Sequence, residues 1–129
     1  MPRFFNPASI AEPSGNRYHH GAEVRAGARM LYLAGQTGTA PDGSVPGSVE
    51  AQSEHVYRNI QAILEEAGMG FENVVKMTAY LVDRDDAAGW RASRLGIMGD
   101  ACPAHTLVYI SGLANPDFRV EVEAIAAED

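Results

Sequence analysis

The last thirty or so residues constrain the fold most, because they predict two β-strands joined by a turn. Residues 102–110 and 119–126 are rich in β-branched and aromatic side chains, which suit the surface of a sheet. Between them, residues 112–117 read Gly-Leu-Ala-Asn-Pro-Asp, a composition typical of turns. We therefore expect the chain to end in a pair of strands.

The second of these strands is predicted to carry charge on one face only. Alternation sends its apolar side chains to one side of the sheet and three charged side chains to the other. The charged set is Arg119, Glu121 and Glu123. Such a face is ordinary for an antiparallel strand with one side in water, but it also offers two acids for acid–base chemistry.

Length and charge exclude several classes of protein. The chain has 129 residues, which predicts a single domain over residues 1–129. Its formal net charge is -7, and its ten Lys and Arg residues are scattered, so nucleic-acid binding is not expected. These features favour a small-molecule or protein partner.

The sequence shows neither a membrane span nor a disulfide. No apolar run approaches the roughly 18 residues that cross a bilayer, and the first residues lack the apolar core of a signal peptide. Cys102 is the only cysteine, so no intrachain disulfide is possible. We expect a cytoplasmic protein stabilised by packing.

The first third of the chain predicts an arm, a hairpin and a loop. Residues 1–17 contain Asn6-Pro7 and Glu12-Pro13 and read as an irregular arm. Residues 18–25 and 30–34 are short β-runs that predict an opening hairpin. Residues 35–47 hold four glycines and two prolines, so we expect a long loop there.

Two helices and a strand are predicted in the middle of the chain. Residues 51–68 carry one apolar stripe, with Ser48 as the N-cap and Gly68 at the C-terminal end. Residues 74–82 predict a strand, followed by a second helix that runs to about Met98. The order ββαβαββ is an α+β layout with both helices on one face of a mixed sheet.

Five blocks of the sequence form a recognisable set through their order and spacing. They are Gly35-Gln36, the helix ending Glu-Glu-Ala-Gly at 65–68, Val-Val-Lys-Met-Thr-Ala-Tyr-Leu-Val-Asp at 74–83, Pro-Ala-His-Thr at 103–106, and the strand 119–126. Together they resemble the reactive-intermediate deaminase family, also called the Rid or YjgF-type family and similar to RutC and endoribonuclease L-PSP proteins. The resemblance implies a chorismate-mutase-like fold, a homotrimer with sheets around the axis, and ligand clefts between subunits. It also implies hydrolysis or deamination of a small imine or enamine.

His105 stands where catalytic members of the family have an arginine that binds the substrate carboxylate. Arginine offers a permanent charge and a planar fork, whereas histidine is mostly neutral near pH 7. The resemblance makes His105 a candidate catalytic residue, as an anion anchor if a neighbouring acid raises its pKa or as a proton donor. The alternative is a histidine at the cleft edge with no catalytic role.

Glu121 matches the family glutamate that positions the attacking water, so the resemblance makes it the second candidate catalytic residue. Glu123 is expected to be structural, although a carboxylate two residues along the same face lies roughly 6.8 Å away. The alternative for Glu121 is a simple ion pair with Arg119.

The resemblance also implies four substrate-binding residues, and Arg17, which departs from the family pattern, is a fifth candidate. Tyr18 matches a tyrosine that reaches across the subunit interface, and Arg17 replaces the proline that usually precedes it. A guanidinium missing at position 105 could be supplied by Arg17, Arg91 or Arg94. Gly35, Gln36 and the main chain of Leu107 match groups that line the cleft.

The residues favour neither a metal nor a cofactor. Cys102, His105 and the His19-His20 pair lack the remaining ligands of a zinc site. No phosphate-binding glycine motif is present.

Three hypotheses for the function follow: a trimeric hydrolase or deaminase of a small reactive metabolite that bears a carboxylate, a non-catalytic metabolite-binding or regulatory trimer, and a trimer that acts through its outer surface. The residues do not identify the substrate.

Overall fold

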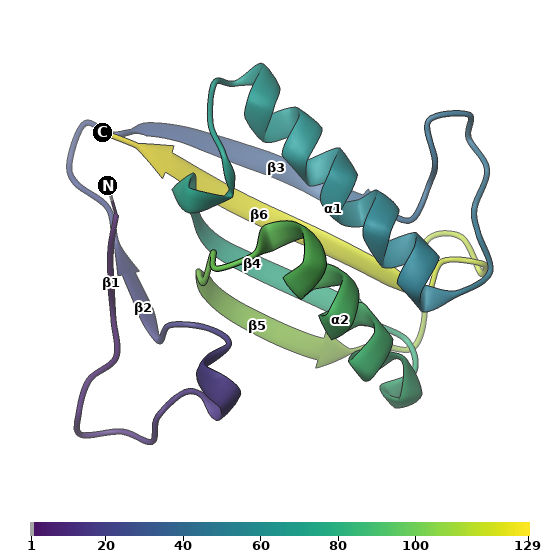
Figure 1. The fold of residues 1–129 in the computed structure, drawn as a ribbon, viewed down its shortest axis with the longest axis horizontal. Coiled ribbons are helices and arrows are strands. Elements are labelled where there is room, and N and C mark those ends of the chain that lie inside the picture. The colour runs from purple at the N-terminus through teal and green to yellow at the C-terminus, as the bar shows by residue number, and fades with distance from the viewer. Residues whose placement is uncertain (1) are drawn as a thin grey trace.

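The fold was analysed in a computed structural model that describes residues 2–129. A four-stranded mixed sheet has the strand order β3-β6-β4-β5, and two long helices lie on the same face of it (Figure 1). β4 and β5 are parallel, while the β3–β6 and β6–β4 pairs are antiparallel. The elements are β1 Arg3–Phe5, β2 Gly21–Glu23, β3 Arg29–Thr37, α1 Val49–Glu66, β4 Val74–Leu81, α2 Ala87–Met98, β5 Ala104–Tyr109 and β6 Val120–Glu128. Three short 3₁₀ turns lie at Ser14–Asn16, Phe71–Asn73 and Arg84–Asp86.

The predicted α+β fold class is confirmed, but the predicted opening hairpin is wrong. β1 lies inside the expected irregular arm and pairs with β2, whereas β3 pairs with the last strand, β6. Gly21 permits the first pair, because a Cβ there would lie 2.5 Å from the ring of Phe5. The partner of β3 is about ninety residues away, a pairing that a local pattern cannot reveal.

The two helices form where the apolar stripes predict them. The Ser48 side chain accepts a hydrogen bond from the Ala51 N–H at 3.1 Å, which caps α1. Gly68 ends the helix with a φ of 72°, a left-handed conformation that favours glycine. Both predicted caps are confirmed.

The core lies between the helices and one face of the sheet. The stripe on α1 is centred on three fully buried side chains, Val56, Ile60 and Leu64. The sheet contributes alternate residues of β4 and β6, which fits a strand with one buried face. These residues are Val74, Met77, Ala79, Leu81, Val120, Val122, Ala124 and Ala126.

Within the described residues 2–129, no helix covers the opposite face of the sheet, and we call it the open face (Figure 1). Tyr32 on β3 is 72% exposed there, and Val108 on β5 is 37% exposed. Within residues 2–129, no helix is long and apolar enough to span a bilayer.

Candidate functional site

Glu121 and Gly35 meet on the open face of the sheet. β3 extends through Thr37, so Gly35 and Gln36 lie in the strand rather than in the predicted loop, beside a register shift between β3 and β6. A Cβ on Gly35 would lie 2.5 Å from Oε2 of Glu121. The glutamate side chain therefore lies directly over the glycine backbone, in space that only glycine leaves free.

Glu121 and Glu123 of β6 have different environments. The Tyr80 hydroxyl donates a hydrogen bond to the Glu123 carboxylate, and this bond, followed by desolvation and the charges of Glu123 and Glu121, raises the pKa of Tyr80. Glu121 makes no hydrogen bond or ion pair with any of residues 2–129. Glu121 is thus the carboxylate that is available to a ligand or a water molecule.

A groove of about 250 Å³ lies on the open face, and Glu123 lines it whereas Glu121 and Gly35 do not. Its lining includes Tyr32, Thr78, Glu123 and Ile125, together with Lys76, whose Nζ donates to the Thr106 hydroxyl at 2.6 Å. The groove therefore combines an aromatic ring with charges of both signs. The side chain of Gln36 is engaged locally, through a 3.2 Å bond from Nε2 to the Ala34 carbonyl.

His105 lies on the other face of the sheet, beneath α2. It pairs in register with the buried Met77 of β4, and its ring centroid is 5.6 Å from that of Trp90. Burial, with added repulsion from Arg94 and Lys76, lowers the pKa of His105 to about 3. Its Nε2 is buried without a hydrogen-bond partner. The imidazole is therefore uncharged at neutral pH.

A cluster of aromatic and polar side chains surrounds this histidine, and we call it the helix-side cluster. It consists of His105, Trp90, Tyr57 and Arg94. Trp90 donates a 2.7 Å hydrogen bond from Nε1 to the Tyr57 hydroxyl, and both side chains are buried. The guanidinium carbon of Arg94 lies 6.0 Å from the Trp90 ring centroid. Neither Trp90 nor Tyr57 was expected near a site, because their spacing reads as an ordinary core stripe.

β5 is one of the two edge strands of the sheet, and the main chain of Leu107 points outward from this edge. The Ile110 N–H donates to the Leu81 carbonyl of β4 at 2.9 Å, so the main-chain polar groups of Ile110 point toward β4. These groups point to alternate sides from one residue to the next along a strand. The N–H and C=O of Leu107, three residues earlier, therefore point away from β4. The Leu107 side chain packs against the core. Within residues 2–129, the only partner on that edge is a single bridge from His19 to Ala104, which places Tyr18 and Arg17 nearby.

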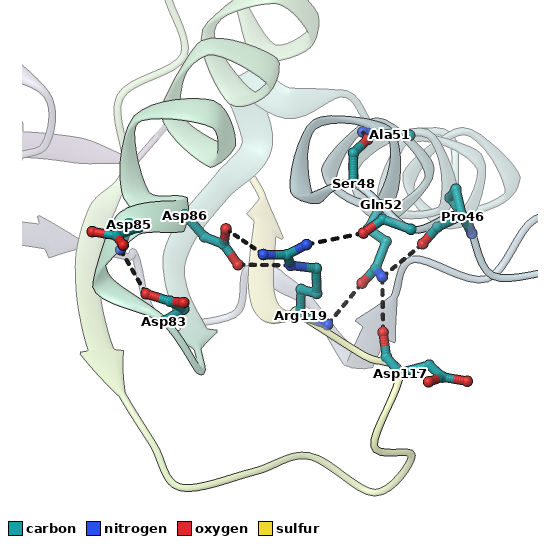
Figure 2. A network of polar contacts seen from close by, with 10 residues as sticks. Pro46, Ser48, Ala51, Gln52, Asp83, Asp85, Asp86, Asp117 and Arg119 are labelled. Carbon is teal, nitrogen blue, oxygen red and sulfur yellow. Dashed lines mark hydrogen bonds and ion pairs between the residues drawn. The ribbon is translucent and has the colours of Figure 1, made fainter.

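Arg119 binds Asp86 rather than Glu121, so the alternative of an ion pair between Arg119 and Glu121 is wrong within this chain. Its Nε and Nη2 donate to both oxygens of Asp86 at 2.9 and 3.0 Å, and Nη1 donates to the Gly47 carbonyl at 3.0 Å. The buried Gln52 amide accepts from the Arg119 N–H and donates to the Pro46 and Asp117 carbonyls, as Figure 2 shows. This network joins three loops to the N-terminal ends of both helices.

The predicted site residues therefore fall into two groups at opposite edges of the sheet. Gly35 and Gln36 are on edge strand β3 beside Glu121, while His105 and Leu107 are on edge strand β5. The edges are three strand spacings apart, roughly 14 Å. His105 and Glu121 also lie on opposite faces, so these two do not share a site within one chain.

No cluster of three or more His, Cys, Asp or Glu side chains suited to a metal ion occurs in the part of the chain that the structure describes. The candidate residues thus offer one available carboxylate on Glu121, one neutral imidazole on His105 and one buried guanidinium on Arg94.

The chain belongs to the endoribonuclease L-PSP family, whose profile matches residues 9–128. A RutC family protein of Pyrococcus abyssi is 38% identical over 102 residues, covering 78% of this chain and 80% of that protein. A mouse protein named 2-iminobutanoate/2-iminopropanoate deaminase is 33% identical over 102 residues, covering 78% and 75%. The crystal structure of YyfB, a Rid family protein from Yersinia pestis, matches with a TM-score of 0.86 at 27% identity over 98% of both chains. The resemblance to the Rid family is confirmed.

Proposed function

We propose that the protein is a cytoplasmic homotrimer that hydrolyses a small imine or enamine bearing a carboxylate, in clefts between neighbouring subunits. Two facts support the reaction class: the chain belongs to this family, and a relative at 33% identity is named as an imine deaminase. The observation that carries the proposal is the Gly35–Glu121 contact, which leaves one carboxylate unpaired on the open face.

The proposed reaction uses Glu121 to hold and deprotonate a water molecule. The water oxygen adds to the carbon of the C=N bond while the nitrogen takes a proton. Collapse of the resulting amino alcohol then breaks the C–N bond, so that ammonia leaves and a carbonyl product remains. Glutamate is suited to this role because it can accept a proton in one step and return it in the next.

An interfacial cleft is supported by the separation of the two groups of residues. In a trimer, the β3 side of one subunit could face the β5 edge of its neighbour, where the Leu107 main chain has free hydrogen-bonding groups. Tyr18 and Arg17 would enter from that neighbour. His105 would contribute shape or a hydrogen bond rather than charge, because its pKa is about 3.

The test is ammonia release from freshly generated α-imino acids. We expect Glu121→Gln to lower kcat/KM by about a hundredfold or more, the usual scale for a general base. Glu123→Gln is the matched control, since it removes a charge two residues along the same strand and should keep most of the activity. Equal losses in the two variants would contradict a specific role for Glu121. Sizing of each variant would check that the trimer persists.

A second candidate function is a non-catalytic metabolite-binding or regulatory trimer. The uncharged His105 favours it, because the ionic anchor of catalytic relatives is missing at that position. Silence of the native protein and activity in His105→Arg would support a scaffold retuned to another ligand. Native activity that depends on Glu121 would exclude this second candidate.

A further inference from the structure

Arg94 is a buried cation without a buried anion. Its side chain on α2 is only 4% exposed, and none of the carboxylates in residues 2–129 forms an ion pair with it. Nη2 donates to the Arg17 carbonyl at 3.2 Å, and Nε is buried without a partner. Burial lowers the pKa of Arg94, which is the sign of an unfavourable environment for its charge.

Arg119 shows how the same chain treats another arginine near its helices. There the guanidinium has both oxygens of Asp86 and a carbonyl as partners. A buried charge with no counter-ion is costly, whereas a charge paired with an oxyanion through two hydrogen bonds is compensated. Arg94 is a buried charge without a counter-ion, so an anion from outside the chain would provide the missing partner.

A cavity of about 270 Å³ provides the place for such an anion. It lies between the C-terminal half of α2, the 3₁₀ turn Ser14–Asn16 and the loop that leads to β5. Arg94 and Arg17 line it with Asp100, so two guanidinium groups and one carboxylate leave one surplus positive charge. Cys102 adds no charge at neutral pH, because burial raises the pKa of its thiol.

We propose that this cavity binds a small carboxylate with a single negative charge, whose oxygens pair with Arg94 and whose short chain lies against Leu95 and Met98. One surplus charge suits a monoanion better than a doubly charged phosphate, and the two apolar side chains suit a hydrocarbon stem. Binding is measured without turnover, so this inference and the deaminase proposal can fail separately.

The single tryptophan of the chain reports on the site directly. Because the guanidinium carbon of Arg94 is 6.0 Å from the Trp90 ring centroid, an anion at Arg94 should change Trp90 fluorescence. The probes are butanoate, neutral butyramide and inorganic phosphate at constant ionic strength, with calorimetry as an independent reading. We expect saturable binding of butanoate, and binding of butyramide and phosphate at least about tenfold weaker, the scale of one charge-assisted pair.

Arg94→Gln should weaken butanoate binding by at least about tenfold, while Arg91→Gln should leave it unchanged. Arg91 is the matched control, because its guanidinium carbon is 5.7 Å from the same ring but does not line the cavity. If Arg94→Gln does not fold, Arg94→Met replaces it. No saturable binding up to about 50 mM, equal binding by the Arg94 variant, or phosphate binding as tight as butanoate would overturn the proposal.

Discussion

The two sides of the sheet treat polar groups in opposite ways. On the open face, Glu121 is within reach of solvent and has no bound partner, and its position depends on the missing side chain of Gly35. In the helix-side cluster, Arg94 and His105 each have a buried nitrogen without a hydrogen bond. A group of the first kind can act on a ligand at little cost to stability. A group of the second kind carries an energetic cost that a ligand or a substitution can relieve.

The largest effect is expected on the open face, from Gly35→Ala. The new Cβ would lie 2.5 Å from the Glu121 carboxylate, which is the end of a flexible side chain and can move aside. Stability should change little, but displacement of a catalytic group by about 1 Å costs on the order of a hundredfold in kcat/KM. Gly112→Ala is the control, because its Cβ would meet open space. Full activity in Gly35→Ala would remove Glu121 from the mechanism.

This comparison also shows what the sequence could predict. The period of 2 in β6 correctly separated Val120 and Val122 from Glu121, because alternation is a local property of a strand. The helices and their caps were predictable for the same reason. By contrast, the pairing of β3 with β6 joins residues about ninety positions apart, and no local pattern carries that information.

The helix-side cluster was only partly predictable. The replacement of arginine by His105 makes Arg17, Arg91 and Arg94 candidate sources of charge, but only the structure shows which of them is buried. Arg94 is 4% exposed, whereas Arg17 is exposed. Likewise, the sequence does not single out Tyr80 on the open face, because a tyrosine within an apolar strand reads as a packing residue.

The next effect in size is expected from Trp90→Phe, on the helix side. This substitution leaves the fully buried Tyr57 hydroxyl without its donor and opens a cavity, so the free energy of unfolding should fall by about 2–3 kcal/mol. Adding Tyr57→Phe removes the orphaned hydroxyl and should recover part of that loss. The open-face counterpart, Tyr80→Phe, should cost less than about 0.5 kcal/mol. Denaturant unfolding followed by circular dichroism measures all four proteins. Similar losses in Trp90→Phe and Tyr80→Phe would contradict the contrast between the two sides.

His105 should make the protein less stable as the pH falls. Its pKa in the folded state is about 3, below the ordinary value of 6.5, so the unfolded chain takes up a proton that the folded chain refuses. Stability from this group is present above about pH 6.5 and decreases as the pH falls toward 3. Between pH 7 and pH 5 the loss is roughly 2 kcal/mol at most. Unfolding at both pH values, in the native protein and in His105→Gln, isolates this contribution. An equal pH dependence in the two proteins would mean that His105 is accessible to protons in the folded state.

The smallest effect on the free energy of unfolding is expected from Arg94→Met, and it is an increase, although most core substitutions lower stability. Removal of a buried charge that has no counter-ion should stabilise the free protein, by roughly 1 kcal/mol, because methionine fills similar space without a desolvation cost. The control Arg91→Met removes a cation near the same tryptophan that is less deeply buried, and should change the free energy of unfolding by less than about 0.5 kcal/mol. With butanoate present, the native protein should become more stable than Arg94→Met, because a ligand stabilises only the protein that binds it. This stabilisation grows with the logarithm of the butanoate concentration once the site is saturated. Thermal unfolding of the three proteins with and without butanoate would show both effects. Destabilisation by Arg94→Met without the anion would mean that the Arg17 carbonyl bond and the packing of the guanidinium already compensate its burial, and that Arg94 belongs with the satisfied residues of the core.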